Sequence, residues 1–410
     1  FEPNSAVYVA SNEEVDFKEY AEYFAEILEE VEQMEAKSLN SISLEAALEL
    51  IVNKYESMSL EELEDENISV KNIKTMRNLL PIFTECLSIM TGGDAEDLPL
   101  KDFEEGGGLN ISGGNHIVTS TFGVTVNKFY NDLVSKYSRT LKTYLSHEVK
   151  AIQCKSNMNT NTPANSHKNI VVHTLDKENS SEKFFHADVV IVTLPLGVLK
   201  KMHTTLFPGG ILPSYKVKSI EKLGFGNILK LYLLFTDAFW KDDNESESPN
   251  DEATWLMCPS ENLGEFQIFL DYSTVTQDPI LLAFAGGKNA TVLENIDDEK
   301  IIIEKAIQSL SKGTGVSIEI LRKKLKCITK TGWGQDPYSY GAYSFLHKKS
   351  GKLDRKNLQA PISIGNNEHN LNNVYFAGEA CHSSWAGTVH GAIDSGRNVA
   401  FQFLKEYDML

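Results

Sequence analysis

Residues 374–400, VYFAGEACHSSWAGTVHGAIDSGRNVA, constrain the fold of this chain more than any other stretch. An apolar run leads into a small-residue turn that carries Glu379, and a second glycine-rich turn then opens a helical pattern. The backbone amides of such a strand–turn–helix can approach an anionic or electron-rich ligand at the helix N-terminus. Gly378, Gly387 and Gly391 leave no side chain where a flat ring could lie. The segment therefore predicts a ligand-binding turn.

Three further motifs occur in order along the chain. Residues 187–200 (ADVVIVTLPLGVLK) contain a continuous apolar run typical of a buried strand. Residues 223–240 (LGFGNILKLYLLFTDAFW) place a glycine-rich turn before a strand, and residues 333–345 (WGQDPYSYGAYSF) gather aromatic side chains. Together with FAGE and TVHGA near the C-terminus, these motifs resemble the flavin-containing amine oxidases, which include polyamine and spermine oxidases and histone-lysine demethylases.

The resemblance implies a mixed α/β fold with two domains, an incomplete Rossmann-like FAD domain and a substrate domain of mixed sheet and helices. We expect residues 1–111 to form the helical part of the substrate domain and residues 205–365 to form its sheet and further helices. Residues 112–204 and 366–410 are expected to build the FAD domain.

Helical periodicity dominates the first hundred residues. It predicts helices over residues 17–37, 43–55 and 76–90, and Ser43 is well placed as an N-cap. Further helices are expected over 129–137 and 298–312, and strands over 115–118, 147–154, 169–175, 183–185, 264–272, 279–285 and 371–376.

Members of this family begin with a βαβ unit that carries GxGxxG, and no GxGxxG followed by a helix occurs here. Gly106–Gly108 precedes no helical pattern and is expected in a flexible loop. The absent unit would need ~30 residues or more. Because a parallel sheet without its first strands exposes an apolar edge, we expect an incomplete or cleaved chain. A separate N-terminal fragment could complete the FAD domain.

Composition narrows the class of partner. The net charge of -18 argues against nucleic acid, whose phosphates require a basic surface, and suits cationic partners, although it is also typical of a soluble surface. No apolar run is long enough to span a membrane. Five cysteines without CxxC spacing predict no metal cluster. These cysteines and the scattered glycosylation sequons leave the compartment open between cytoplasmic and secreted.

The resemblance implies that the C-terminal turn binds FAD. Glu379 would accept hydrogen bonds from the ribityl or ribose hydroxyls, with Gly378 and Gly387 beside the cofactor. The backbone amides of Thr388 and Val389 would face the flavin pyrimidine edge and stabilise negative charge as the flavin is reduced. The alternatives are a helix N-terminal acid that complements the dipole, and a turn that is only structural.

The same resemblance implies an aromatic cage for the substrate. Trp333 would pack near the isoalloxazine, and Tyr343 would form one wall, whose face attracts alkylammonium groups. Tyr338 belongs to this constellation, and Thr388 occupies the position of the other wall, which leaves the cage more open. The backbone of Val149 is expected beside the adenine. Ordinary core packing is the alternative for these aromatic side chains.

Gln277 departs from the family pattern. The resemblance implies a lysine just before the strand that reads PILL, where it holds a water against the reactive flavin nitrogen. The aligned residue here is Gln277, which can hydrogen-bond a water but carries no charge. Slow turnover or altered oxygen reactivity is therefore expected.

The expected activity is FAD-dependent oxidation of a small cationic amine, of the spermine or spermidine type. Hydride transfer to the flavin would give an imine, water would hydrolyse it, and dioxygen would reoxidise the flavin with release of peroxide. The alternative is a non-catalytic relative that keeps the scaffold for binding or assembly. Gln277 and the absent GxGxxG favour that alternative.

Overall fold

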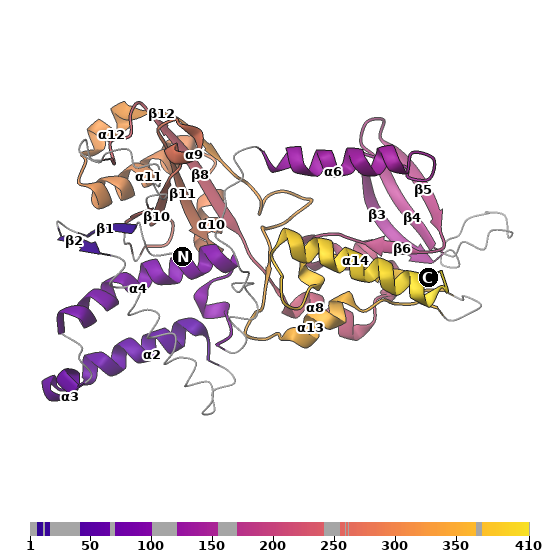
Figure 1. Cartoon of the computed structure of the whole chain (residues 1–410), viewed down its shortest axis with the longest axis horizontal. Helices are drawn as coiled ribbons and strands as arrows, with labels where there is room; N and C mark the ends of the chain where they lie inside the picture. Colours follow the sequence, from indigo (N-terminus) through magenta and orange to yellow (C-terminus); the bar gives the residue numbers. More distant parts are fainter. Residues whose placement is uncertain are drawn as a thin grey trace.

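The computed structural model describes residues 6–10, 13–16, 42–65, 70–100, 121–154, 170–241, 255–258, 260, 262–365 and 371–409. The helix expected over 17–37, the glycine loop at 106–108 and the extended segment at 115–118 lie outside these ranges. Figure 1 shows the described elements in two halves side by side, one built on a large sheet and the other around α6, β3–β6 and α14.

The first half contains a seven-stranded sheet. Its strands, in spatial order, are β12 (Leu325–Lys330), β8 (Ile228–Phe235), β11 (Ile280–Gly286), β10 (Ile268–Asp271), β9 (Trp255–Met257), β1 (Ala6–Ala10) and β2 (Glu13–Asp16). Only the pairing of β1 with β9 is parallel among these described strands. Every second side chain of β8 from Leu229 onward is buried, as expected for a strand whose two faces differ.

Helices pack on this sheet or on one another beside it (Figure 1). They are α2 (Leu44–Ser57), α3 (Leu60–Asp65), α4 (Val70–Thr91), α9 (Ser273–Thr276), α10 (Gly287–Glu294), α11 (Glu299–Thr314) and α12 (Ile318–Lys324), with the short η1 (Ala95–Asp97). The predicted N-cap of α2 is confirmed, because Ser43 Oγ accepts a hydrogen bond from the Ala46 amide at 3.3 Å.

The second half combines a three-stranded antiparallel sheet with a parallel strand pair. The sheet consists of β3 (His147–Cys154), β4 (Ile170–Asp176) and β5 (Ser181–Ala187), and the pair consists of β6 (Val190–Val192) and β14 (Val374–Phe376). The remaining elements are α6 (Phe122–Lys136), α7 (Leu196–Leu206), η3 (Pro208–Gly210), α8 (Ser214–Lys222), β7 (Gly224–Phe225), β13 (Ser344–Phe345), α13 (Lys352–Gln359), η4 (Glu379–Cys381) and α14 (Val389–Glu406).

The core of the second half includes α8 and α13. Both helices fall within residues 205–365, which were expected to belong to the substrate domain. Lys216 of α8 is fully buried and donates to three backbone oxygens of residues 357, 358 and 360, at the end of α13. Its ammonium also lies 3.9 Å from the centre of the Phe376 ring on β14. These contacts attach α8 and α13 to β6 and β14, and the expected domain boundaries stay a prediction.

Two expectations about secondary structure are wrong. Residues 6–10 and 13–16 form strands in a region read as helical, because β1 extends the sheet by pairing with β9, far away in sequence. The apolar run at 187–200 forms a strand of only three residues, and Ile191 in its middle is 45% exposed. No described element covers that face of β6.

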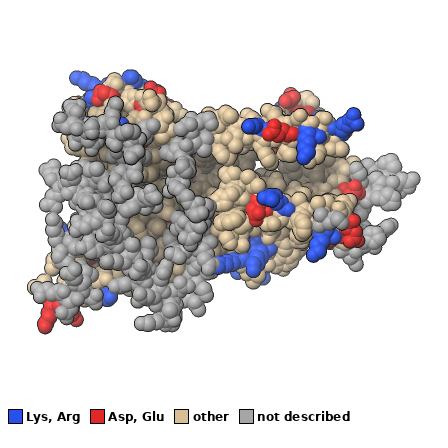
Figure 2. All heavy atoms as spheres, viewed as in Figure 1, with Lys and Arg blue, Asp and Glu red and all other residues tan. Residues whose placement is uncertain are grey.

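Apolar side chains on α6 also face solvent. This helix has no buried residue, and Phe122, Val126, Phe129 and Leu133 follow one stripe along it. Figure 2 shows the face of the molecule recessed between α6 and α14. No described helix is long and apolar enough to cross a membrane.

Candidate active site

A pocket of about 450 Å³ lies where the large sheet meets residues 333–343. Its lining is mostly apolar and aromatic, which suits a small organic ligand. The lining residues are Ile89, Pro195, Phe225, Ile228, Lys230, Phe284, Trp333, Ser339, Gly341, Ala342 and Tyr343. We call this space the aromatic pocket.

Trp333 and Tyr343, two of the predicted cage residues, come together in this pocket. The Tyr343 hydroxyl donates to the backbone oxygens of Ile89 at 2.6 Å and Met90 at 3.0 Å, near the end of α4. Burial raises the pKa of this hydroxyl, so the phenol stays neutral and its ring is fixed as a wall. Tyr338 does not line the pocket, and its side chain is 54% exposed.

Lys230 contributes an ammonium group to the same pocket. It interrupts the apolar strand β8, is half-buried, and holds its Nζ 5.8 Å from the centre of the Phe284 ring. No carboxylate in the described part of the chain forms an ion pair with it. A single lysine inside the apolar run ILKLYLLF was the sequence signal that could have identified it.

Gln277 is not brought to this pocket. It ends the short helix α9 in a left-handed conformation, with φ of 65°, and its side chain is exposed. Strand β11 begins three residues later, and Phe284, near the other end of that strand, is the residue that lines the pocket. The geometry therefore separates Gln277 from Trp333 and Tyr343.

Glu379 joins the C-terminal turn to the segment that carries Tyr343. Its carboxylate accepts hydrogen bonds from Ser344 Oγ at 2.7 Å, from the Ser344 amide at 3.3 Å and from the Gly387 amide at 2.6 Å. Arg355, which is fully buried, donates through Nη1 to Ser344 Oγ at 2.8 Å. Glu379 thus has protein partners, and its contact with a cofactor hydroxyl stays a prediction.

The turn beside Glu379 leaves room for a flat ligand. Gly378 has φ of 142°, and a side chain added there would meet no atom within 4 Å. Gly387, with φ of 73°, lies against Tyr343, whose Cδ2 would be 3.3 Å from an added Cβ. The aromatic pocket and the glycine turn are therefore neighbours.

Thr388 is the N-cap of α14. Its hydroxyl accepts from the Gly391 amide at 3.1 Å and donates to the Trp385 carbonyl at 2.7 Å. Val389 follows and is 52% exposed. The first amides of an 18-residue helix therefore face an open surface, which suits an electron-rich ring. Thr388 does not line the aromatic pocket.

The residues of the glycine turn and the start of α14 fit the isoalloxazine part of a flavin cofactor better than its adenine part. The open space at Gly378, the start of α14 and the half-exposed Trp333 are the observations that fit an isoalloxazine. Val149 lies on β3 next to a register shift in its pairing with β4, and packs against the core of the second half. Its contact with adenine stays a prediction.

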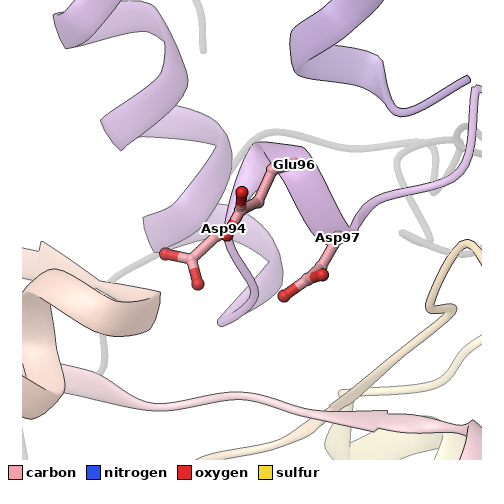
Figure 3. Close-up of side chains that lie close together, drawn as sticks. All are labelled: Asp94, Glu96 and Asp97. Atoms are coloured by element: carbon pink, nitrogen blue, oxygen red, sulfur yellow. The ribbon is translucent and has the colours of Figure 1, made fainter.

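Asp94, Glu96 and Asp97 form a carboxylate cluster at η1, with candidate ligand atoms within 4.8 Å of one another (Figure 3). Lys288 forms an ion pair with Glu96, and Lys348 Nζ lies 3.8 Å from Asp97 Oδ1. Since nearby cations already balance two of these acids, we assign no metal to the cluster.

A glycine turn at an open helix N-terminus lies beside an aromatic pocket, which is the arrangement predicted from the sequence for a flavin-type oxidoreductase site. The family model described as flavin containing amine oxidoreductase matches residues 57–402. The chain belongs to this family. The predictions of the family, of a mixed α/β fold and of FAD as cofactor are thereby confirmed.

Relatives fall into two groups. The chain is 32% identical to lysine-specific histone demethylase 1 homolog 2 of Arabidopsis thaliana over 225 residues, which is 55% of this chain and 28% of that protein. It is 33% identical to lysine-specific histone demethylase 1 homolog 1 of Oryza sativa subsp. japonica over 226 residues, 55% and 24% of the two chains. It is 26% identical to polyamine oxidase 4 of the same rice over 377 residues, 92% and 64%. The chain spans less than two thirds of each of these relatives.

Proposed function

We propose that this chain supplies the substrate pocket and the flavin-ring site of an FAD-dependent amine oxidase that acts on polyamines. The observation that carries the proposal is that Trp333, Tyr343 and Lys230 meet in one pocket beside the Gly378–Gly387 turn. The near-complete coverage of this chain by its match to polyamine oxidase 4 supports a polyamine rather than a peptide substrate.

Bound FAD supplies the oxidant that removes hydride from the carbon next to the amine nitrogen. The aromatic faces of Trp333 and Tyr343 orient the amine and its alkyl chain. The apolar walls exclude bulk water, and the positive charge of Lys230 disfavours a protonated amine beside it. The amine therefore reacts as the neutral base, whose lone pair assists loss of hydride.

Lys230, rather than Gln277, is proposed for the role that the family resemblance gives to a lysine. Its ammonium reaches the pocket and can hold a water there, whereas Gln277 is exposed beyond the start of β11. Under this proposal, Gln277 gives no reason to expect slow turnover.

The exposed apolar face of the second half supports a further part of the proposal. Parallel sheets are normally buried on both faces, yet β6 and β14 form a pair with Ile191 exposed, and Phe129 on α6 is 64% exposed. We propose that additional parallel strands, from a segment outside the described residues or from a separate fragment, complete the FAD-binding half.

The test combines visible absorbance with peroxide release. The chain, purified alone and after co-expression with the dinucleotide-binding segment of a polyamine oxidase relative, is expected to show flavin absorbance in the second case. It should then release peroxide with spermine or acetylated polyamines. A folded protein that stays colourless in both cases would instead support the non-catalytic alternative.

Substitution of Lys230 by Met is expected to slow turnover by roughly 100-fold or more, as for loss of a positioned proton-transfer group. Gln277→Ala, the matched control, is expected to keep turnover within about twofold, because surface changes away from a site have small effects. Flavin content, read from absorbance, should be equal in both variants. A stronger loss in Gln277→Ala than in Lys230→Met would contradict the assignment.

A further inference from the structure

Glu294 is a buried carboxylate that lies outside the aromatic pocket but beside the segment that carries Trp333. It is the last residue of α10, the helix that directly follows β11, and it is only 6% exposed. Burying a carboxylate is costly unless donors surround it, so such a group normally has specific partners. The partners of Glu294 therefore indicate what it does in this fold.

Both oxygens of this carboxylate receive a donor from a segment that reaches the pocket. Oε1 accepts a hydrogen bond from the Gly334 amide at 3.0 Å, and Oε2 accepts one from Asn227 Nδ2 at 2.7 Å. Gly334 directly follows Trp333, and Asn227 directly precedes Ile228 at the start of β8. Because Trp333 and Ile228 both line the pocket, one carboxylate joins two of its walls.

The end of α10 also holds the chain on the other side of Trp333. Lys330 Nζ donates to the Glu294 carbonyl oxygen at 2.9 Å. At Gly334 the approach is too close for a side chain, because an added Cβ would overlap Glu294 Oε2 and lie 2.8 Å from Asn227 Nδ2. Trp333 thus lies between two backbone segments that are both attached to one residue.

The same connection reaches Tyr343, the other aromatic wall. Asn227 follows Gly226, whose amide donates to the Tyr343 carbonyl oxygen at 2.8 Å. Through Asn227, Glu294 is therefore linked to the strand segment of Tyr343, and through the Gly334 amide it is linked to Trp333. The separation of the two aromatic side chains depends on both links.

We propose that Glu294 is a positioning residue of the aromatic pocket, which sets where Trp333 lies relative to Tyr343 and thereby the affinity for the amine. The inference rests on the proposed function, because it takes this pocket to be the amine site. Glu294 does not line the pocket, so it acts through Trp333 and not on the substrate. Contacts with an aromatic face depend on where the ring lies, so a displaced Trp333 binds the amine less well.

Asn227 provides a specific test. Its Oδ1 is buried and has no hydrogen-bond partner in the described structure, since Nδ2 is the atom turned toward Glu294. In Glu294→Gln the new amide can donate to that oxygen once the Asn227 side chain turns over, while its own oxygen accepts from Gly334. In Glu294→Leu neither bond can form. Glutamine should therefore replace the carboxylate, and leucine should not.

The first measurement requires no flavin. Acrylamide quenching of Trp333 fluorescence, taken as the difference between each variant and its Trp333→Phe counterpart, reports how firmly the indole is held. Glu294→Leu is expected to raise the quenching constant. Glu294→Gln should leave it unchanged, as should Glu299→Leu, the control at an exposed carboxylate in the first turn of α11.

The second measurement uses the FAD-loaded protein with spermine, well below the melting temperature of every variant. Glu294→Leu is expected to raise KM roughly fivefold, with a smaller change in kcat, as for a weakened contact with an aromatic face. Glu294→Gln and Glu299→Leu should keep KM within about twofold. A carboxylate that only stabilises the fold would lower the melting temperature and leave KM unchanged.

Two results would overturn the inference. Glu294→Leu could match the wild type in both quenching and KM, or Glu294→Gln could lose as much as Glu294→Leu. A wild-type protein without turnover would contradict the proposed function alone, and the quenching measurement would still decide the role of Glu294. Should Glu294→Leu fail to fold, Asn227→Ala removes one of the two bonds and should shift both readouts in the same direction.

Discussion

Glu379 and Lys216 are single residues that connect parts of the chain far apart in sequence. The Glu379 carboxylate receives donors from Ser344 and Gly387, and so keeps the Tyr343 ring next to the C-terminal turn. Lys216 fastens the end of α13 to α8 through three carbonyl oxygens. At both positions, an ionisable side chain holds separate backbone segments together.

Replacement of Lys216 by Met should destabilise the protein by about 3 kcal/mol or more, since three carbonyl oxygens, one buried and two partly buried, lose their donor. Lys218→Met, on the exposed side of the same helix, should change the free energy of unfolding by less than about 0.5 kcal/mol. Urea unfolding of the two variants measures the difference. Equal stability would show that water, and not the lysine, satisfies these oxygens.

Glu85 should make the stability of the protein depend on pH. Burial raises its pKa in the folded state from 4.5 to about 7. The folded state then binds more protons than the unfolded state between these values, so the free energy of unfolding falls as the pH rises through this window. The full effect, reached above about pH 7, is on the order of 3 kcal/mol.

Glu85→Gln cannot ionise and should remove this contribution. Urea unfolding at several pH values is expected to show the variant gaining stability relative to the wild type as the pH rises from about 4.5 to about 7. A difference that stays constant over this range would mean that the pKa of Glu85 is not raised.

At the scale of elements, α14 carries much of the candidate site. It begins directly after the glycine turn, its N-cap is Thr388, and its first turn lies at an open surface. The 14-residue helix α2 begins with a similar hydroxyl cap at Ser43 but lies in the other half of the molecule. The two helices therefore permit a matched comparison of capping and ligand binding.

Thr388→Ala and Ser43→Ala should each cost about 1 kcal/mol of stability, because each leaves a helix amide without its acceptor. Only Thr388→Ala should also weaken retention of flavin, since it loosens the first turn of α14. Thermal unfolding measures the first effect, and absorbance after dialysis of the FAD-loaded protein measures the second. Equal flavin loss in both variants would argue against a cofactor at α14.

At the scale of the whole molecule, the two halves are unequally covered. Helices pack on the large sheet, and its core contains fully buried residues such as Leu79 on α4. In the other half, β6 and α6 present apolar side chains to solvent. This asymmetry is the physical reason to expect another polypeptide segment on that half.

Phe129→Ser on α6 should change the stability of the isolated chain by less than about 0.5 kcal/mol, because its ring is mostly exposed. Leu79→Ala, within the core, should cost about 2–5 kcal/mol. The Phe129 variant should also bind less of a hydrophobic dye and lose flavin when the dinucleotide-binding segment is supplied. A large loss of stability in Phe129→Ser alone would mean that α6 is already covered.

Local patterns were enough to predict many elements. β3 has the expected bounds, Ser43 caps α2 as expected, and Asp298 precedes α11. Periodicity and capping depend on neighbouring residues, so they can be read without the fold. The motifs at 333–345 and 374–400 likewise identified Trp333, Tyr343 and the glycine turn, because their chemistry lies within short stretches.

The sequence by itself determined the family, the glycine turn and the aromatic segment, since each resides in contiguous residues. Only the tertiary structure decided that Lys230 enters the pocket and Gln277 does not, because strand pairing sets which end of β11 lies beside β8 and Trp333. It alone also placed β1 beside β9 and gathered five carboxylates from α2, α4 and residues 94–96 around one cavity. Such contacts join residues distant in the chain, and no local pattern encodes them.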